Sequence, residues 1–206
     1  MMRIYIITMD DPIQTYHFIK DIIDAKKDQI VGLSVPNGNR LTLAKGKSKY
    51  AYIFSLLLIM GPFHFIKNGL LTMFHKIRLK FSKYGIINDP SILSYAKKLG
   101  IPAIRIKTPN NKEFREYLKY LGIDVIINQS QSFIKKELLD IPKIGVLNRH
   151  NALLPKNRGR LTPFGFYIME KKKQEFQFIL LKNRWTQEIS WCKKDLMLLI
   201  KTHLTL

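Results

Sequence analysis

Acidic residues are scarce in this chain of 206 residues, since 15 Asp and Glu stand against 35 Lys and Arg, a formal net charge of +20. Cysteine occurs once, which excludes an intramolecular disulfide framework and favours a reducing, cytoplasmic compartment. Glycine (11) and proline (9) are too few for a collagen-like or low-complexity chain. No long apolar run occurs in Met1 to Ile7, so no secretory signal is expected. The 46% of hydrophobic residues instead predicts a globular chain with one good core.

The excess of positive charge predicts attraction to phosphate-rich partners such as RNA, anionic lipid or nucleotide substrates. The lysines are spread between Ile-, Asn- and Phe-rich segments, and coding DNA rich in A and T produces the same usage. No nucleic-acid-binding motif accompanies the charge. A basic RNA-binding protein is therefore an alternative that only the charge favours.

Short β-branched runs alternate with helical segments along most of the chain. Strand, helix and strand at this spacing form a βαβ unit, which builds a parallel sheet. The predicted fold class is α/β: a Rossmann-like parallel sheet flanked by helices and incomplete at its C-terminal end. The expected strands are residues 2–8, 29–35, 103–106, 123–128 and 144–148, and the expected helices include one beginning at Asp11-Pro12 and those at 91–99, 111–121 and 134–139.

The most apolar stretch runs from Tyr50 to Ile66 and is interrupted by Gly61-Pro62. It is too short and too interrupted to predict a membrane span, because proline and glycine break a helix. Two helices, residues 49–60 and 63–79, are predicted in its place. Packing in the core and peripheral contact with a membrane surface both explain their apolar residues.

Ile144 to Gly159, I-G-V-L-N-R-H-N-A-L-L-P-K-N-R-G, carries the residues with chemical potential. Asn148 and His150 lie at the carboxyl end of a predicted strand, the edge where parallel α/β sheets bind ligands. Because side chains alternate along a strand, these two can face one pocket. An asparagine amide can donate to an oxyanion, and a histidine titrates near neutrality. On its own N-x-H is a weak pattern, since a loop histidine is more often structural.

The surrounding residues make the pattern specific. N-R-H-N-A-L-L-P-K-N-R-G resembles the active-site segment of the folate-dependent formyltransferases, whose pattern is N-x-H-x-S-L-L-P-x-x-R-G. The preceding stretch, from L-G-I-D-V-I-I-N-Q-S to L-L-D-I-P-K-I-G, resembles the same family. The likeness spans about residues 85 to 170, with one departure at Ala152, where the family commonly has Ser.

This resemblance implies transfer of a formyl group from 10-formyltetrahydrofolate, the cofactor, to an amine. The amine attacks the formyl carbon, Asn148 would hydrogen-bond the developing oxyanion, and His150 would stabilise it and shuttle protons. No metal is implied, and the amine acceptor stays open between methionyl-tRNA, a sugar nucleotide and another small amine. A non-catalytic remnant or binding module of the same fold is the alternative. The residues implied in folate binding are Asn128, Gln129, Ser130, Leu153, Leu154 and Pro155.

The expected domain covers residues 1–170, and residues 171–206 form a tail that departs from the family. The family continues with a segment like T-G-V-S-I-H-F-V and then D-x-G-x-I, whose Asp assists the catalytic His. This chain has no Asp between His150 and Asp195. Regrouping the codons by one base permits the family segment over Gln174 to Leu181. At Thr186 the result is forced, because Trp is TGG and Thr begins AC, so the shifted codon is GAC, Asp.

We therefore expect the tail to be read out of frame from about Lys171, after an A-rich tract encoding Lys171-Lys172-Lys173. The chain would then lack the family's catalytic Asp and be impaired as an enzyme. Any structure in the tail is expected to be helical or loosely placed rather than a strand that continues the sheet. A genuine divergent tail is the alternative.

Overall fold

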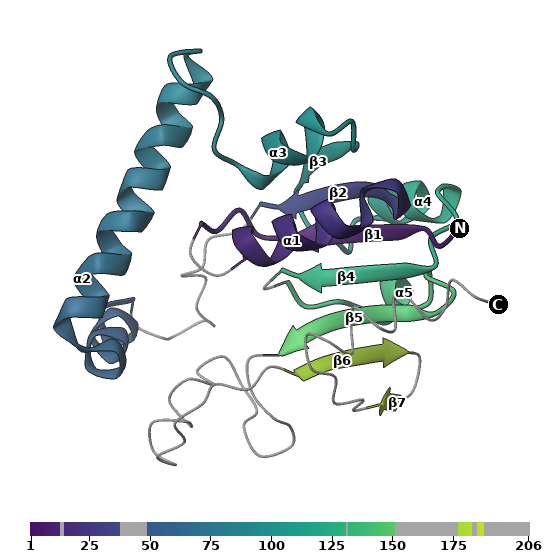
Figure 1. Cartoon of the computed structure of the whole chain (residues 1–206). Helices are drawn as coiled ribbons and strands as arrows, with labels where there is room; N and C mark the ends of the chain where they lie inside the picture. The colour runs from purple at the N-terminus through teal and green to yellow at the C-terminus, as the bar shows by residue number, and fades with distance from the viewer. Residues whose placement is uncertain (13–14, 38–48, 131, 151–176, 183–184, 188–206) are drawn as a thin grey trace. The chain divides into compact units, whose positions relative to one another are not determined.

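The computed structural model describes residues 1–12, 15–37, 49–130, 132–150, 177–182 and 185–187. Within these residues the sheet has the strand order β3-β2-β1-β4-β5-β6-β7, and β2 with β3 and β4 with β5 pair in parallel (Figure 1). The prediction of a Rossmann-like parallel sheet flanked by helices is confirmed. The strands are β1 (Ile4–Thr8), β2 (Ile30–Pro36), β3 (Ala103–Ile106), β4 (Val125–Gln129), β5 (Gly145–His150), β6 (Gln177–Lys182) and β7 (Trp185–Gln187). The helices are α1 (Tyr16–Lys26), the 3-10 turn η1 (Lys27–Gln29), α2 (Lys49–Lys83), α3 (Ile92–Lys98), α4 (Lys112–Tyr120) and α5 (Lys136–Leu139).

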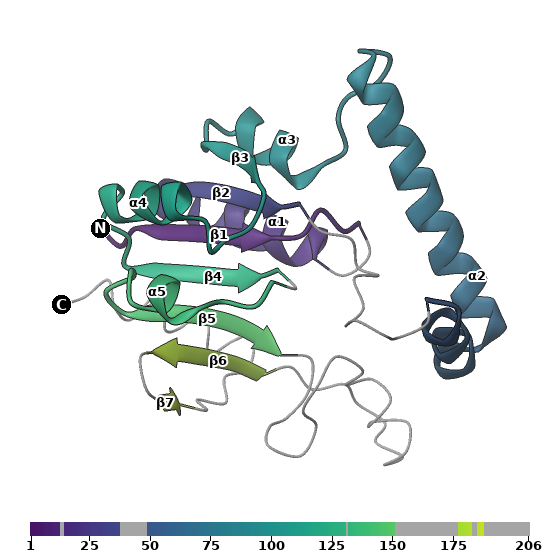
Figure 2. The ribbon, with the colours of Figure 1, turned by 180° about the vertical axis from the view of Figure 1, so that it is seen from behind.

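The described residues fall into two compact units, and the first holds β1 up to Ile7 together with α4, β4, α5 and β5 to β7. Every residue of β4 is buried, as expected for a central parallel strand covered on both faces. Helix α4 lies beside β1 (Figure 2). The Tyr5 ring on the strand packs edge to face against the rings of Phe114 and Tyr117 on the helix. Aromatic packing thus fixes the helix to the sheet in this unit.

The second unit holds α1, η1, β2, α2, α3 and β3. Helix α1 buries Ile19, Ile22 and Ile23, which recur at helical spacing on one face. Helix α3 begins where the sequence predicts, because the Ser91 hydroxyl accepts a hydrogen bond from the Ser94 N–H at 3.1 Å and caps the first turn. Helix α1 begins at Tyr16 rather than at Asp11, with Thr15 as its N-cap residue.

Helix α2 consists of two helices joined at a kink. Gly61 has φ 72° and ψ 161°, outside the helical region and in the range that favours glycine, and Pro62 follows it. The predicted break is therefore confirmed. Of the two explanations for the apolar residues of these helices, packing in the core does not hold for Tyr50, Phe63 and Phe74, which are exposed. No helix in the described part of the chain has both the length and the hydropathy for crossing a membrane.

The tail contributes strands, against the expectation that it would not continue the sheet. β6 pairs antiparallel with β5, with Leu180 opposite Leu147 and Ile179 opposite Asn148, and β7 pairs antiparallel with β6. The physical reason is local: Phe178 to Leu181 is an apolar run with β propensity, and the edge of β5 offers unpaired backbone groups. An open strand edge can pair with an apolar run of this kind whether or not the run corresponds to a strand of the formyltransferases.

Candidate active site

Two asparagines from neighbouring parallel strands meet at the carboxyl ends of β4 and β5. Asn128 stands opposite Asn148 in the strand register, and its Nδ2 donates a hydrogen bond of 3.2 Å to Oδ1 of Asn148. Asn128 is buried and Asn148 is half-buried. Three pairs of apolar or glycine residues precede the asparagine pair in the ladder, so the amides lie towards the carboxyl edge, where such sheets bind ligands.

Three other predicted site residues lie in the described part of the chain. Gln129 is buried beside Asn128 and donates from Nε2 to the Asn128 carbonyl at 3.3 Å. The Ser130 hydroxyl accepts from the Ser132 N–H at 3.3 Å, which shapes the turn after β4. His150 ends β5 two residues after Asn148, and its side chain is not among those the structure describes.

Leu153, Leu154 and Pro155, the remaining residues implied in folate binding, lie outside the described residues. The structure therefore brings together Asn128, Gln129 and Asn148 of the predicted set. The pairing of Asn128 with Asn148 follows from the strand register, which the sequence pattern alone does not give.

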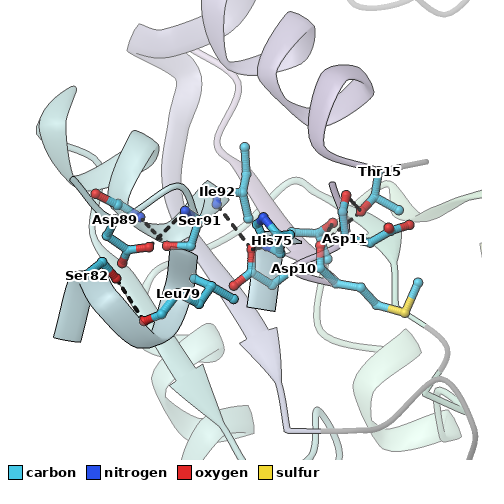
Figure 3. Close-up of polar contacts among 12 residues, drawn as sticks. Asp10, Asp11, Thr15, His75, Leu79, Ser82, Asp89, Ser91 and Ile92 are labelled. Carbon is cyan, nitrogen blue, oxygen red and sulfur yellow. Dashed lines mark hydrogen bonds and ion pairs between the residues drawn. The ribbon is translucent and has the colours of Figure 1, made fainter. Parts of the chain in front are cut away.

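A second polar cluster, in the other unit, was missed by the sequence reasoning. Asp10 lies two residues after the end of β1, and its Oδ2 accepts a hydrogen bond of 2.7 Å from Nη2 of Arg105 on β3. Its Oδ1 lies 3.4 Å from the Ile92 N–H and 3.9 Å from Nε2 of His75 on α2 (Figure 3). Asp10 thus connects α2, α3 and β3 within this unit. The available signal was an acidic residue two positions after a buried strand.

Burial lowers the pKa of His75 below its ordinary value of 6.5, and the nearby Arg78 guanidinium lowers it further. The carboxylates of Asp10 and Asp89 act in the opposite direction but are outweighed. The neutral imidazole is therefore the form that the fold favours. In that form His75 packs α2 against the Asp10 cluster without adding a charge.

Acidification is expected to remove a stabilising contribution of His75. Because its pKa is lower in the folded than in the unfolded chain, the contribution is complete above about pH 6.5 and is lost as pH falls through the lowered folded pKa. The free energy of unfolding in urea, measured at pH 7.5 and pH 5, should fall less in His75→Gln than in the unmodified chain. His64→Gln, at an exposed position of the same helix, is the matched control and should keep the unmodified pH dependence. Equal pH dependence in all three proteins would contradict this assignment.

The fold and the paired asparagines define a class: a Rossmann-like α/β protein with uncharged amide side chains at the carboxyl edge of its sheet. No protein-family model matches the chain. A methionyl-tRNA formyltransferase from Ruminiclostridium cellulolyticum is 38% identical over 88 residues, covering 41% of this chain and 27% of that protein. One from Thermotoga sp. (strain RQ2) is 36% identical over 110 residues, covering 47% of this chain and 32% of that protein. The matched region thus spans a third or less of the length of these relatives.

Solved structures of two glycinamide ribonucleotide transformylases share the fold. Glycinamide ribonucleotide transformylase 1 from Symbiobacterium toebii matches with a TM-score of 0.52 at 12% identity, over 91% of this chain and 69% of that one. The protein of the same name from Geobacillus kaustophilus gives a TM-score of 0.51 at 15% identity, over 90% and 77%. At sequence identities this low, the structural matches show a shared fold and say nothing about function. The chain is thus similar in sequence, over less than half of its length, to methionyl-tRNA formyltransferases. It shares the fold of the two transformylase structures.

Proposed function

We propose that the edge formed by β4 and β5 is a formyl-transfer site that takes 10-formyltetrahydrofolate as donor and an amine as acceptor, in the cytoplasm. The observation that carries the proposal is the hydrogen bond between Asn128 and Asn148 at the ends of two adjacent parallel strands. The named formyltransferase relatives support it. The acceptor class stays open between methionyl-tRNA, a sugar nucleotide and another small amine.

The orientation of the Asn148 amide suits an oxyanion. The Asn148 Oδ1 accepts a hydrogen bond from Nδ2 of Asn128, and this bond orients the amide. The NH₂ group on the other side of the amide is a donor of the kind that stabilises the negative oxygen formed when an amine attacks a formyl carbon. One such donor is worth roughly a hundredfold to a thousandfold in rate. Asn128 would then be a positioning residue for Asn148.

The remaining roles follow from the resemblance and are part of the proposal. His150, two residues further along β5, would stabilise the tetrahedral intermediate and move protons. The folate would lie against Asn128 to Ser130 and against Leu153 to Pro155. A folate carries carboxylates, and the net charge of +20 favours its approach.

Folate binding should depend on the asparagine pair. We expect Asn148→Ala and Asn128→Ala each to weaken binding of 10-formyltetrahydrofolate by roughly tenfold, because each change leaves a polar group of the pair without its partner. The double variant should lose less than the product of the single losses, since the two residues act through one hydrogen bond. Isothermal titration calorimetry on the full chain measures all three.

Asn88→Ala is the matched control, because Asn88 is exposed and belongs to neither strand. It should bind folate as the unmodified chain does. Unchanged affinity in Asn148→Ala, with the variant still folded by circular dichroism, would remove the support for this site.

A further inference from the structure

The second half of α2, residues 63–83, presents an apolar stripe to solvent. At the helical period of 3.6 residues, seven apolar side chains fall on an arc of about 100°. Their exposed fractions run from 42% at Ile77 to 73% at Phe63. The stripe residues are Phe63, Ile66, Leu70, Met73, Phe74, Ile77 and Phe81. His75, which packs against the Asp10 cluster, lies on the opposite side of the same helix. The stripe is therefore an outward face, and the helix is held by its other side.

Basic residues border this stripe on both sides. By the same period, Lys67 and Arg78 lie along one border, and Lys76, Lys80 and Lys83 lie along the other, all exposed. The Arg78 guanidinium lies 6.0 Å above the Phe74 ring, which places a cation at the margin of the apolar surface. The whole of α2 contains no Asp or Glu. An apolar stripe between rows of cations is the composition of helices that lie in the surface of an anionic membrane.

We propose that α2 docks on an anionic lipid bilayer, with the stripe residues sunk among the acyl chains and the bordering lysines at the phosphates. Charge complementarity selects this occupant. A second copy would bring cation rows against cation rows with no acidic residue on the helix to pair them. RNA would satisfy the cations but leave the apolar side chains in water. The kink at Gly61 separates this helix from residues 49–60, so the stripe can lie flat while the preceding segment takes another direction.

Vesicle binding by the full chain tests the proposal. Co-sedimentation with vesicles of phosphatidylglycerol and phosphatidylcholine in equal parts should exceed that with pure phosphatidylcholine by at least roughly tenfold in affinity. Leu70→Ser with Phe74→Ser should weaken binding roughly 30-fold or more, because two apolar side chains no longer insert. Lys76→Gln with Lys80→Gln should weaken it roughly 10- to 30-fold on the anionic vesicles, and added salt should reproduce that loss.

The matched control is Tyr120→Ser with Phe133→Ser, which removes two exposed aromatic side chains outside α2 and should bind as the unmodified chain does. All variants are checked for folding by circular dichroism. Failure to bind either vesicle overturns the proposal, as does equal loss in the control. Self-association in ultracentrifugation that disappears in Leu70→Ser with Phe74→Ser, without vesicle binding, would assign the stripe to a second copy instead. The proposal does not rest on formyl transfer, so either can fail alone.

Discussion

Formyl transfer by the chain with its present tail is expected to stay near the uncatalysed background. The Asp that the resemblance to the folate-dependent formyltransferases implies, which would orient His150 and favour its charged form, has no counterpart between His150 and Asp195. Catalytic residues that act as a unit lose most of their effect when one is removed, commonly several orders of magnitude in rate. We therefore expect turnover from 10-formyltetrahydrofolate to small amines to be residual, carried by whatever donors remain.

The comparison protein carries the other reading frame, with T-G-V-S-I-H-F-V in place of Gln174 to Leu181 and D-A-G-D-I-V-V-Q-K in place of Thr186 to Lys194. Turnover should rise by orders of magnitude in that protein and fall again when Asn148→Ala is added to it. Efficient turnover by the chain with its present tail would contradict the prediction, because another residue would then be doing the work assigned to the Asp. Sequencing the gene across codons 171 to 206 tests the frame directly.

A measurement of folate binding distinguishes an enzyme that is only impaired in turnover from a chain that has lost the proposed folate site. Asn128, Gln129 and Asn148 precede the tail, and hydrogen bonds join Asn128 to Asn148 and Gln129 to the Asn128 carbonyl. We therefore propose that binding survives while turnover does not. The strand pairing of Gln177–Lys182 with β5 supplies a neighbour for Asn148 on its other side, where Ile179 stands opposite it in register. In the alternative frame the same position carries His, by the codons that the family pattern selects.

The sheet could be predicted from the sequence because buried parallel strands leave a local mark. Runs such as Ile4 to Ile7 and Val125 to Ile127 consist of β-branched or aromatic residues, and each lies in a buried strand. The start of α1 could not be placed as well, because Pro12 is compatible with a first helical turn but does not require one. The first and last residues of a helix depend on single hydrogen bonds, which cannot be read from the composition of the sequence.

Burial of α2 was not predictable in the same way. Hydropathy shows that a helix has apolar residues, but it does not say whether protein, lipid or water covers them. The Asp10 cluster shows a related limit, since Arg105 and His75 come from distant segments and meet Asp10 only in the fold. The site was partly predictable because its residues have a local signal in the sequence. Asn128 and Asn148 lie at the carboxyl ends of predicted strands, and the carboxyl ends of adjacent parallel strands meet at one edge of the sheet.

Loss of the Tyr5 ring is expected to cost about 3–5 kcal/mol of the free energy of unfolding in Tyr5→Ala, a large fraction of the total for a domain of this size. Tyr5 is 1% exposed on β1, and its ring centroid lies 5.8 Å from that of Phe114 and 6.4 Å from that of Tyr117. Truncation leaves a cavity between strand and helix and removes both edge-to-face contacts, so α4 loses its main aromatic anchor on the sheet.

Urea unfolding followed by circular dichroism measures the effect, with two controls that isolate its cause. Tyr120→Ala removes a ring from the same helix at a position that is 88% exposed, and should change stability by no more than about 0.5 kcal/mol. Tyr5→Phe keeps the ring and its contacts, so it should retain most of the stability that Tyr5→Ala loses. A loss in Tyr5→Phe as large as that in Tyr5→Ala would instead assign the effect to the hydroxyl group. An unchanged Tyr5→Ala would mean that the α4 helix is held to β1 by contacts other than this aromatic cluster.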